Sequence, residues 1–178
     1  SQSDGQLCCL RVRDGFPVWQ GDATNRCDGE PVVWKNRIAY GNCDGAIYVF
    51  DSETGGLKGS VTVGAEDQMA GGLLAMDGEL LVAGTRQGNL AVVNAGEFSL
   101  KGLASVSQSE AFVTPVISFD NLIAMGTAEG DVVFCRMVKQ GLQIASRFAV
   151  GAAVDRLMFS GERLAVLAGG KLCMLIAP

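Results

Sequence analysis

Five glycines, each followed by an apolar run, recur along the chain at nearly constant spacing. Consecutive glycines are 40, 43, 42 and 40 residues apart. The five marker glycines are Gly5, Gly45, Gly88, Gly130 and Gly170. Internal repetition with this period is typical of propellers and solenoids. The repeat therefore constrains the fold more than any other feature of the sequence.

Each repeat contains up to four short runs separated by turn residues, and no run shows the apolar spacing of a helix. Complete sets of four occupy residues 31–63, 71–106 and 113–150, while the N-terminal residues supply two runs and the C-terminal residues three. Four antiparallel strands in about 42 residues are typical of a β-propeller blade. We predict an all-β fold, a β-propeller of four-stranded antiparallel blades, with about four blades' worth of repeats in one region over residues 1–178. The repeats span about 1–24, 30–64, 70–107, 112–150 and 154–178.

The strands are expected to be buried on both faces. Positions three and four after each marker glycine are mostly apolar, and adjacent strand positions face opposite sides of a sheet. Strands of this kind fit blades packed between blades. The competing β-sandwich would lack the regular repeat.

Two sets of glycines carry structural expectations. The marker glycines follow tight turns and can supply the positive φ that a hairpin requires. Gly41, Gly84 and Gly126 end the second run of their repeats, which indicates either a close backbone approach or a positive φ.

The strand count leaves two ring sizes open. A closed ring of four blades would pair the N-terminal run Phe16–Asp22 with the C-terminal runs, which leaves the run Leu7–Val12 redundant. Alternatively, the chain is about half of a ring of seven or eight blades, completed by another chain or segment. We favour the larger ring, because a small ring with open ends would expose an apolar edge strand.

Two hairpins carry a family resemblance. The sequences DGAIYVFDSETGGL, from Asp44 to Leu57, and DGQLCCLRVRDGFPVW, from Asp4 to Trp19, resemble the pyrroloquinoline-quinone-like repeats of quinoprotein alcohol dehydrogenase-like propellers. Trp19 falls where that family often places a docking tryptophan, whereas the other repeats have leucine, glycine or isoleucine around this position. WD-repeat propellers are also similar, but their Gly-His and Trp-Asp marks are missing here.

The composition excludes several kinds of chemistry. The chain has no histidine, which removes mechanisms that need an imidazole base and most catalytic zinc sites. The net charge of −5, with 14 scattered basic residues, argues against a nucleic-acid surface. No apolar run approaches the ~20 residues of a membrane span.

The resemblance implies a quinone held between a tryptophan and a disulfide of adjacent cysteines, with calcium nearby. Cys8 and Cys9 are adjacent, but they lie within a strand, where their side chains point to opposite faces. We therefore expect no catalytic residue, cofactor or metal site. The six cysteines are interpreted as reduced packing residues, which favours a cytoplasmic location.

The sequence thus favours a non-catalytic propeller that acts as a protein-interaction or scaffold module within a larger protein or complex. The alternative is part of a quinoprotein-like oxidoreductase or a small-molecule sensor. The loops between blades and the turns after the second strands share one face, which carries nine acidic residues against three arginines. Met69 and Phe112 look like exposed apolar anchors on it, so a basic, partly hydrophobic protein or peptide partner is expected. The candidate partner-binding residues are Glu66, Asp67, Met69, Arg86, Glu110, Phe112 and Glu129.

Overall fold

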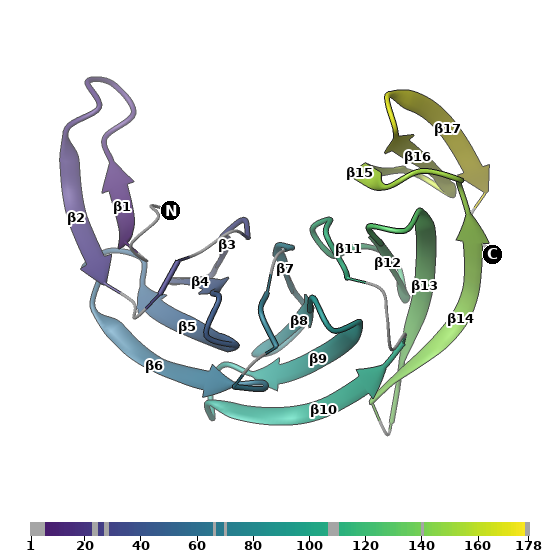
Figure 1. The fold of residues 1–178 in the computed structure, drawn as a ribbon. Coiled ribbons are helices and arrows are strands. Elements are labelled where there is room, and N and C mark those ends of the chain that lie inside the picture. The colour runs from purple at the N-terminus through teal and green to yellow at the C-terminus, as the bar shows by residue number, and fades with distance from the viewer. Residues whose placement is uncertain are drawn as a thin grey trace.

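The chain folds into an open arc of antiparallel sheets (Figure 1). The computed structural model describes residues 6–22, 25–26, 29–65, 67–69, 71–106, 111–139 and 141–176. Within them are seventeen strands and no helix. The strands form five sheets, here called blades 1 to 5 in chain order.

Blades 2, 3 and 4 are complete four-stranded sheets, and in each of them the strands pair in chain order. Blade 1 has two strands and blade 5 has three. The strands are β1 (Gln6–Leu10), β2 (Pro17–Asp22), β3 (Val32–Trp34), β4 (Arg37–Gly41), β5 (Ala46–Asp51), β6 (Leu57–Thr62), β7 (Leu73–Ala75), β8 (Leu80–Gly84), β9 (Asn89–Asn94), β10 (Ser99–Ser105), β11 (Ile117–Phe119), β12 (Leu122–Gly126), β13 (Asp131–Val138), β14 (Gly141–Ala149), β15 (Val154–Ser160), β16 (Arg163–Ala168) and β17 (Lys171–Ile176). This arrangement confirms the predicted propeller blades.

The short first strands of the blades line the concave side of the arc, and the long fourth strands β6, β10 and β14 run along its convex side (Figure 1). The marker glycines stand at the turns between the second and third strands. Gly45, Gly88, Gly130 and Gly170 have φ values of 80°, 74°, 99° and 73°. The predicted positive φ is therefore confirmed at these four, while Gly5 lies outside the described residues.

Each interface between blades is an apolar core built from the alternating residues of the third strands. In β5, Ile47 and Val49 face blade 3 and pack with Leu81 and Val93. Tyr48, between them in sequence, packs on the other side in the cluster that blade 2 shares with blade 1. The strands are therefore buried on both faces, as the sequence predicts, because each blade lies between two others.

The four-bladed ring, one of the two alternatives from the sequence, is not formed. Among the described residues β2 pairs with β1 and β17 pairs with β16, and the two end blades lie at opposite ends of the arc (Figure 1). Strand number alone suggested that β2 could complete blade 5. The curvature of the arc, which depends on packing between blades, holds the two strands apart.

Candidate partner-binding face

The loops between blades and the turns after the second strands lie together, as the sequence analysis expects. The same hydrogen bond joins them at three interfaces. The backbone N–H of the loop residue donates to a carbonyl oxygen of the turn, at 3.3, 3.0 and 3.1 Å. The donor and acceptor pairs are Met69 and Asn42, Phe112 and Thr85, and Val154 and Thr127. We call this side of the molecule the loop rim.

The acceptor residues also organise the turns from within. The Thr85 hydroxyl accepts the backbone N–H of Asn89 at 3.1 Å, and the Thr127 hydroxyl accepts that of Asp131 at 3.0 Å. The Asn42 side-chain oxygen accepts the backbone N–H of Ala46 at 3.3 Å. Because these three polar residues are fully buried, their hydrogen bonds offset a desolvation cost that would otherwise destabilise the turns.

The donors of the loop rim each place a side chain against a glycine. A Cβ added at Gly41 would lie 2.6 Å from the Met69 sulfur, and one at Gly84 would lie 2.7 Å from the Phe112 Cβ. At Gly126 the added Cβ would lie 2.4 Å from Val154 Cγ1. None of the three glycines has a positive φ. Close approach is therefore the reason for these glycines, and it is an approach by a side chain rather than by backbone.

This packing corrects the interpretation of two candidate residues. Met69 and Phe112 are only 1% and 0% exposed, so the expectation that they are exposed anchors for a partner is wrong. They stand in polar loops, which made them look exposed, but each inserts between two blades. Their role is to hold neighbouring blades together.

The remaining candidates differ in their surroundings. Asp67 is buried and its carboxylate accepts the backbone N–H of Gln87 at 3.0 Å and the Asn89 side-chain N–H at 2.7 Å. It therefore braces the turn of blade 3. Arg86 and Glu129 are exposed on the loop rim. Glu66 and Glu110 lie outside the described residues, and binding of a basic partner by this acidic face stays a prediction.

The cysteines do not fit the quinone site that the resemblance implies. Cys8 and Cys9 occupy successive positions of β1, and the five described cysteines are free thiols. Burial raises the pKa of Cys135 to about 11, which keeps this thiol protonated and unreactive. The described residues contain no group of three or more potential metal-ligating side chains. In the same part of the chain, no helix is long and apolar enough to cross a membrane.

The two ends of the arc expose surface that the interior blades bury, which the sequence analysis missed. Leu172 and Met174 of β17 are 71% and 54% exposed. The residues at the same distances from the marker glycines in blades 2, 3 and 4 are 0–3% exposed. These equivalents are Ile47, Leu90 and Val132, and Val49, Val92 and Phe134. Counting positions from Gly170 would have identified this end face.

The side of the molecule opposite the loop rim shows the family's docking tryptophan. The Trp19 ring lies against Gly55, where an added Cβ would be 2.5 Å from ring carbon Cε3. Its indole N–H donates to the Ser52 carbonyl at 3.0 Å. Gly55 has a φ of 71° and belongs to the turn between β5 and β6 of the next blade. The predicted position of the docking tryptophan is thus confirmed.

A carboxylate holds that turn in shape. Asp51 accepts the backbone N–H groups of Glu53 and Thr54, both at 3.0 Å, and pairs with the Lys58 ammonium at 3.0 Å. The hydrogen bond from Thr54 is the largest cause that lowers the pKa of Asp51 to about 2, followed by Lys58 and the Glu53 backbone. The receiving surface for Trp19 is therefore formed before the ring is added.

Repeat length, blade topology and the tryptophan contact agree with one family. The family model described as outer membrane protein assembly factor BamB matches residues 1–165. The chain belongs to this family of pyrroloquinoline-quinone-like β-propellers. A curated relative, the outer membrane protein assembly factor BamB of Taylorella asinigenitalis (strain MCE3), is 31% identical over 80 residues. That stretch covers 44% of this chain and 21% of the relative.

Solved structures show the same fold at low sequence identity. The computationally designed Ika8 protein is 20% identical with a TM-score of 0.82, over 98% of this chain and 53% of Ika8. BamB from Moraxella catarrhalis is 18% identical with a TM-score of 0.65, over 96% and 66% of the two chains. Saccharomyces cerevisiae Sqt1 is 17% identical with a TM-score of 0.79, over 98% and 56%. The chain thus spans about half to two thirds of these propellers.

Proposed function

We propose that the protein is a non-catalytic β-propeller module that acts as a protein-interaction scaffold within a larger protein or complex. The observation that carries the proposal is the match of residues 1–165 to a family described as an assembly factor. The free thiols of Cys8 and Cys9 also support it, because they do not form the disulfide that the quinoprotein alternative requires.

A spectrum and a metal analysis of the purified protein test the non-catalytic role. The expected result is an absorbance spectrum of protein alone, with no stoichiometric calcium. A bound chromophore, or calcium at one equivalent per chain, would support the oxidoreductase or sensor alternative and overturn the proposal.

We also propose that further blades cover the two end faces and complete a larger ring. Inside the arc, the face that carries positions two and four after a marker glycine always packs on the next blade. Leu172 and Met174 present that face with nothing on it, and Leu10 is exposed on the opposite face of β1. Burying such aliphatic side chains contributes about 1.5–3 kcal/mol each, so the end faces favour association.

Native mass spectrometry tests the completion of the ring. A doubled mass relative to 18.6 kDa would show completion by a second copy. In that case the double variant Leu172→Asp, Met174→Asp should return the chain to a monomer, while Val33→Asp, at an exposed site elsewhere, should not. A stable monomer of 18.6 kDa that binds no hydrophobic dye would show that the end faces need no cover.

A further inference from the structure

Each interface between complete blades has an outer slot, the space between the fourth strand of one blade and the turn before the fourth strand of the next. The register of the strands defines which residues are equivalent in these slots. The fourth-strand residue is the one opposite the position four after the marker glycine. These residues are Trp19 opposite Cys9, Gly59 opposite Val49, and Gly102 opposite Val92.

The turn side of the slot is equally regular. Gly55, Phe98 and Gly141 occupy it in blades 2, 3 and 4, with φ values of 71°, 50° and 123°. The three slots therefore share one backbone arrangement, and they differ in which side chains fill them.

The first two slots each hold one aromatic ring against one glycine. In the first, the ring belongs to the fourth strand, where Trp19 lies on Gly55. In the second, the two roles are exchanged, because Phe98 of the turn lies on Gly59 of the fourth strand, and an added Cβ would be 2.7 Å from its ring. The slot thus accepts an aromatic ring from either side.

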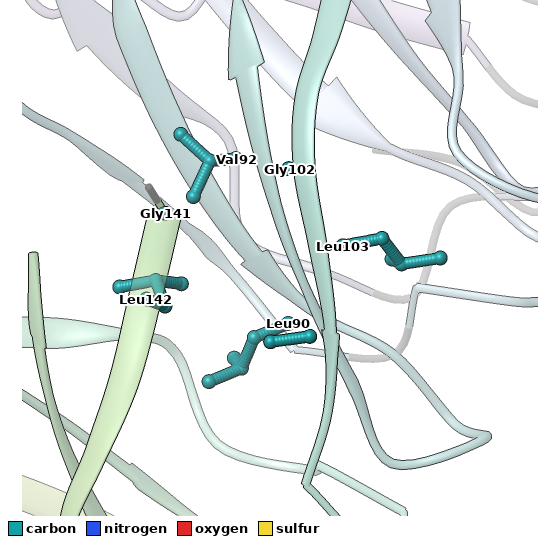
Figure 2. A pocket seen from close by; sticks show the side chains of 7 residues that line it. Leu90, Val92, Gly102, Leu103, Gly141 and Leu142 are labelled. Carbon is teal, nitrogen blue, oxygen red and sulfur yellow. The ribbon is translucent and has the colours of Figure 1, made fainter. Parts of the chain in front are cut away.

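The third slot has glycine on both sides. A Cβ added at Gly102 would find its nearest neighbour, the Gly141 Cα, at 3.9 Å. A pocket of about 100 Å³ occupies the place of the ring. Figure 2 shows Leu90, Val92 and Leu142 on one side of β10, toward the pocket, while the side chain of Leu103 points to the other side.

We propose that the outer slot between β10 and β14 binds an aromatic side chain of a protein partner, with tryptophan as the best fit. This inference rests on the proposed role as a protein-interaction module and names one of its contact sites. The ring would take the place that Trp19 and Phe98 take in the equivalent slots. All side chains that line the pocket are aliphatic, which suits a ring and gives a charged group no partner.

The size and surroundings of the slot fit a side chain presented by a protein. An engineered apolar cavity of about 150 Å³ in another protein binds benzene, so a pocket of about 100 Å³ that opens at the surface can take a partly inserted ring. Beside it on β14, Ile144 lies opposite Cys135 and is exposed, so the peptide that carries the ring would also meet an apolar side chain.

Methyl NMR with two probes tests the slot directly. Indole should shift the methyl signals of Leu90, Val92 and Leu142 in a saturable way, with a dissociation constant near 1 mM. A short peptide with one central tryptophan should bind at the same methyls at least as tightly, and the same peptide with alanine should not. If indole binds but the tryptophan peptide does not, the slot takes free small molecules and the proposal is overturned.

Variants on both sides of the comparison make the test specific. Gly102→Trp copies the pair formed by Trp19 and Gly55, so it should weaken indole binding at least tenfold without lowering Tm. Gly102→Leu, a smaller filling, should weaken binding if the tryptophan variant does not fold. Phe98→Gly should create a second indole site beside Gly59. Indole shifts that persist unchanged in the filled variants would overturn the proposal, whatever the cofactor analysis shows.

Discussion

The two sides of each blade interface solve the same packing problem in different ways. At the loop rim, a side chain from the loop packs on a glycine at all three complete positions, as Met69, Phe112 and Val154 do. At the outer slots, the ring comes from the fourth strand, then from the turn, and then from neither. The loop rim is therefore the constant part of the interface, and the outer slot is the variable part.

The difference shows which contact the blades require. The loop rim combines a buried side chain with a backbone hydrogen bond and a buried polar residue, so losing the side chain would leave a cavity beside buried polar groups. The outer slot lies on the convex side near solvent, where an empty position costs less. An interface can therefore lose its outer ring and keep its place in the arc.

The largest effect is expected from emptying the loop rim. Phe112→Ala removes a fully buried ring between blades 3 and 4 and should lower the free energy of unfolding by about 3–5 kcal/mol. Urea denaturation measures the change. Val113→Ala, at the neighbouring exposed position, serves as the control and should cost far less. Equal effects at the two positions would show that the wedge is not special.

A smaller loss should follow from overfilling the same place. Gly84→Val puts a branched side chain where a Cβ alone already approaches Phe112 at 2.7 Å, so it should destabilise by about 2 kcal/mol or more. Gly102→Ala is the matched substitution at the empty outer slot, with 3.9 Å to its nearest atom. Its unfolding midpoint should equal or exceed that of the wild type. A wild-type midpoint for Gly84→Val would show that the glycine is incidental.

Emptying a filled outer slot should cost less than emptying the loop rim. Trp19→Ala removes the ring from Gly55 and the hydrogen bond to Ser52, and because Trp19 is only half-buried we expect a loss of about 1–2 kcal/mol. Val18→Ala, on the same strand and exposed, should change stability by less than about 0.5 kcal/mol. A loss for Trp19→Ala as large as that for Phe112→Ala would remove the distinction between the two sides.

The smallest effect concerns the pH dependence of the turn that receives Trp19. The pKa of Asp51 is lowered from 3.8 to about 2 in the folded chain, so its contribution is present above pH ~4 and is lost as the pH falls through ~2. Urea midpoints of the wild type and of Asp51→Asn should therefore differ at pH 5 and converge toward pH 2. A difference that does not change over this range would contradict the role of the ionised carboxylate.

The fold could be predicted because its repeat is written in glycines. A positive φ at Gly45, Gly88 and Gly130 is a local requirement, and local requirements leave a regular mark in the sequence. The choice between a four-bladed ring and an open arc could not be made in this way. It depends on how each blade twists against the next, which is a sum of many side-chain contacts.

The candidate site was harder to predict because a polar loop says little about the direction of one side chain. Met69 and Phe112 look exposed by the composition of their neighbours, yet each stands 28 residues after its glycine partner, as Val154 does after Gly126. That constant offset was a usable signal. The glycine at the tryptophan position of the third repeat was visible too, but only the structure shows that Gly141 leaves its slot open.

The open arc has a consequence for how cooperatively the chain unfolds. Each blade contacts only its neighbours, so the molecule behaves as a short one-dimensional array, in which stability is a sum of blade and interface contributions. Blade 3 has a complete blade on both sides, whereas blades 1 and 5 each have a neighbour on one side only. Amide hydrogen exchange should therefore be slowest in β8 and β9 and become faster toward both ends, so that the arc frays from its tips inward.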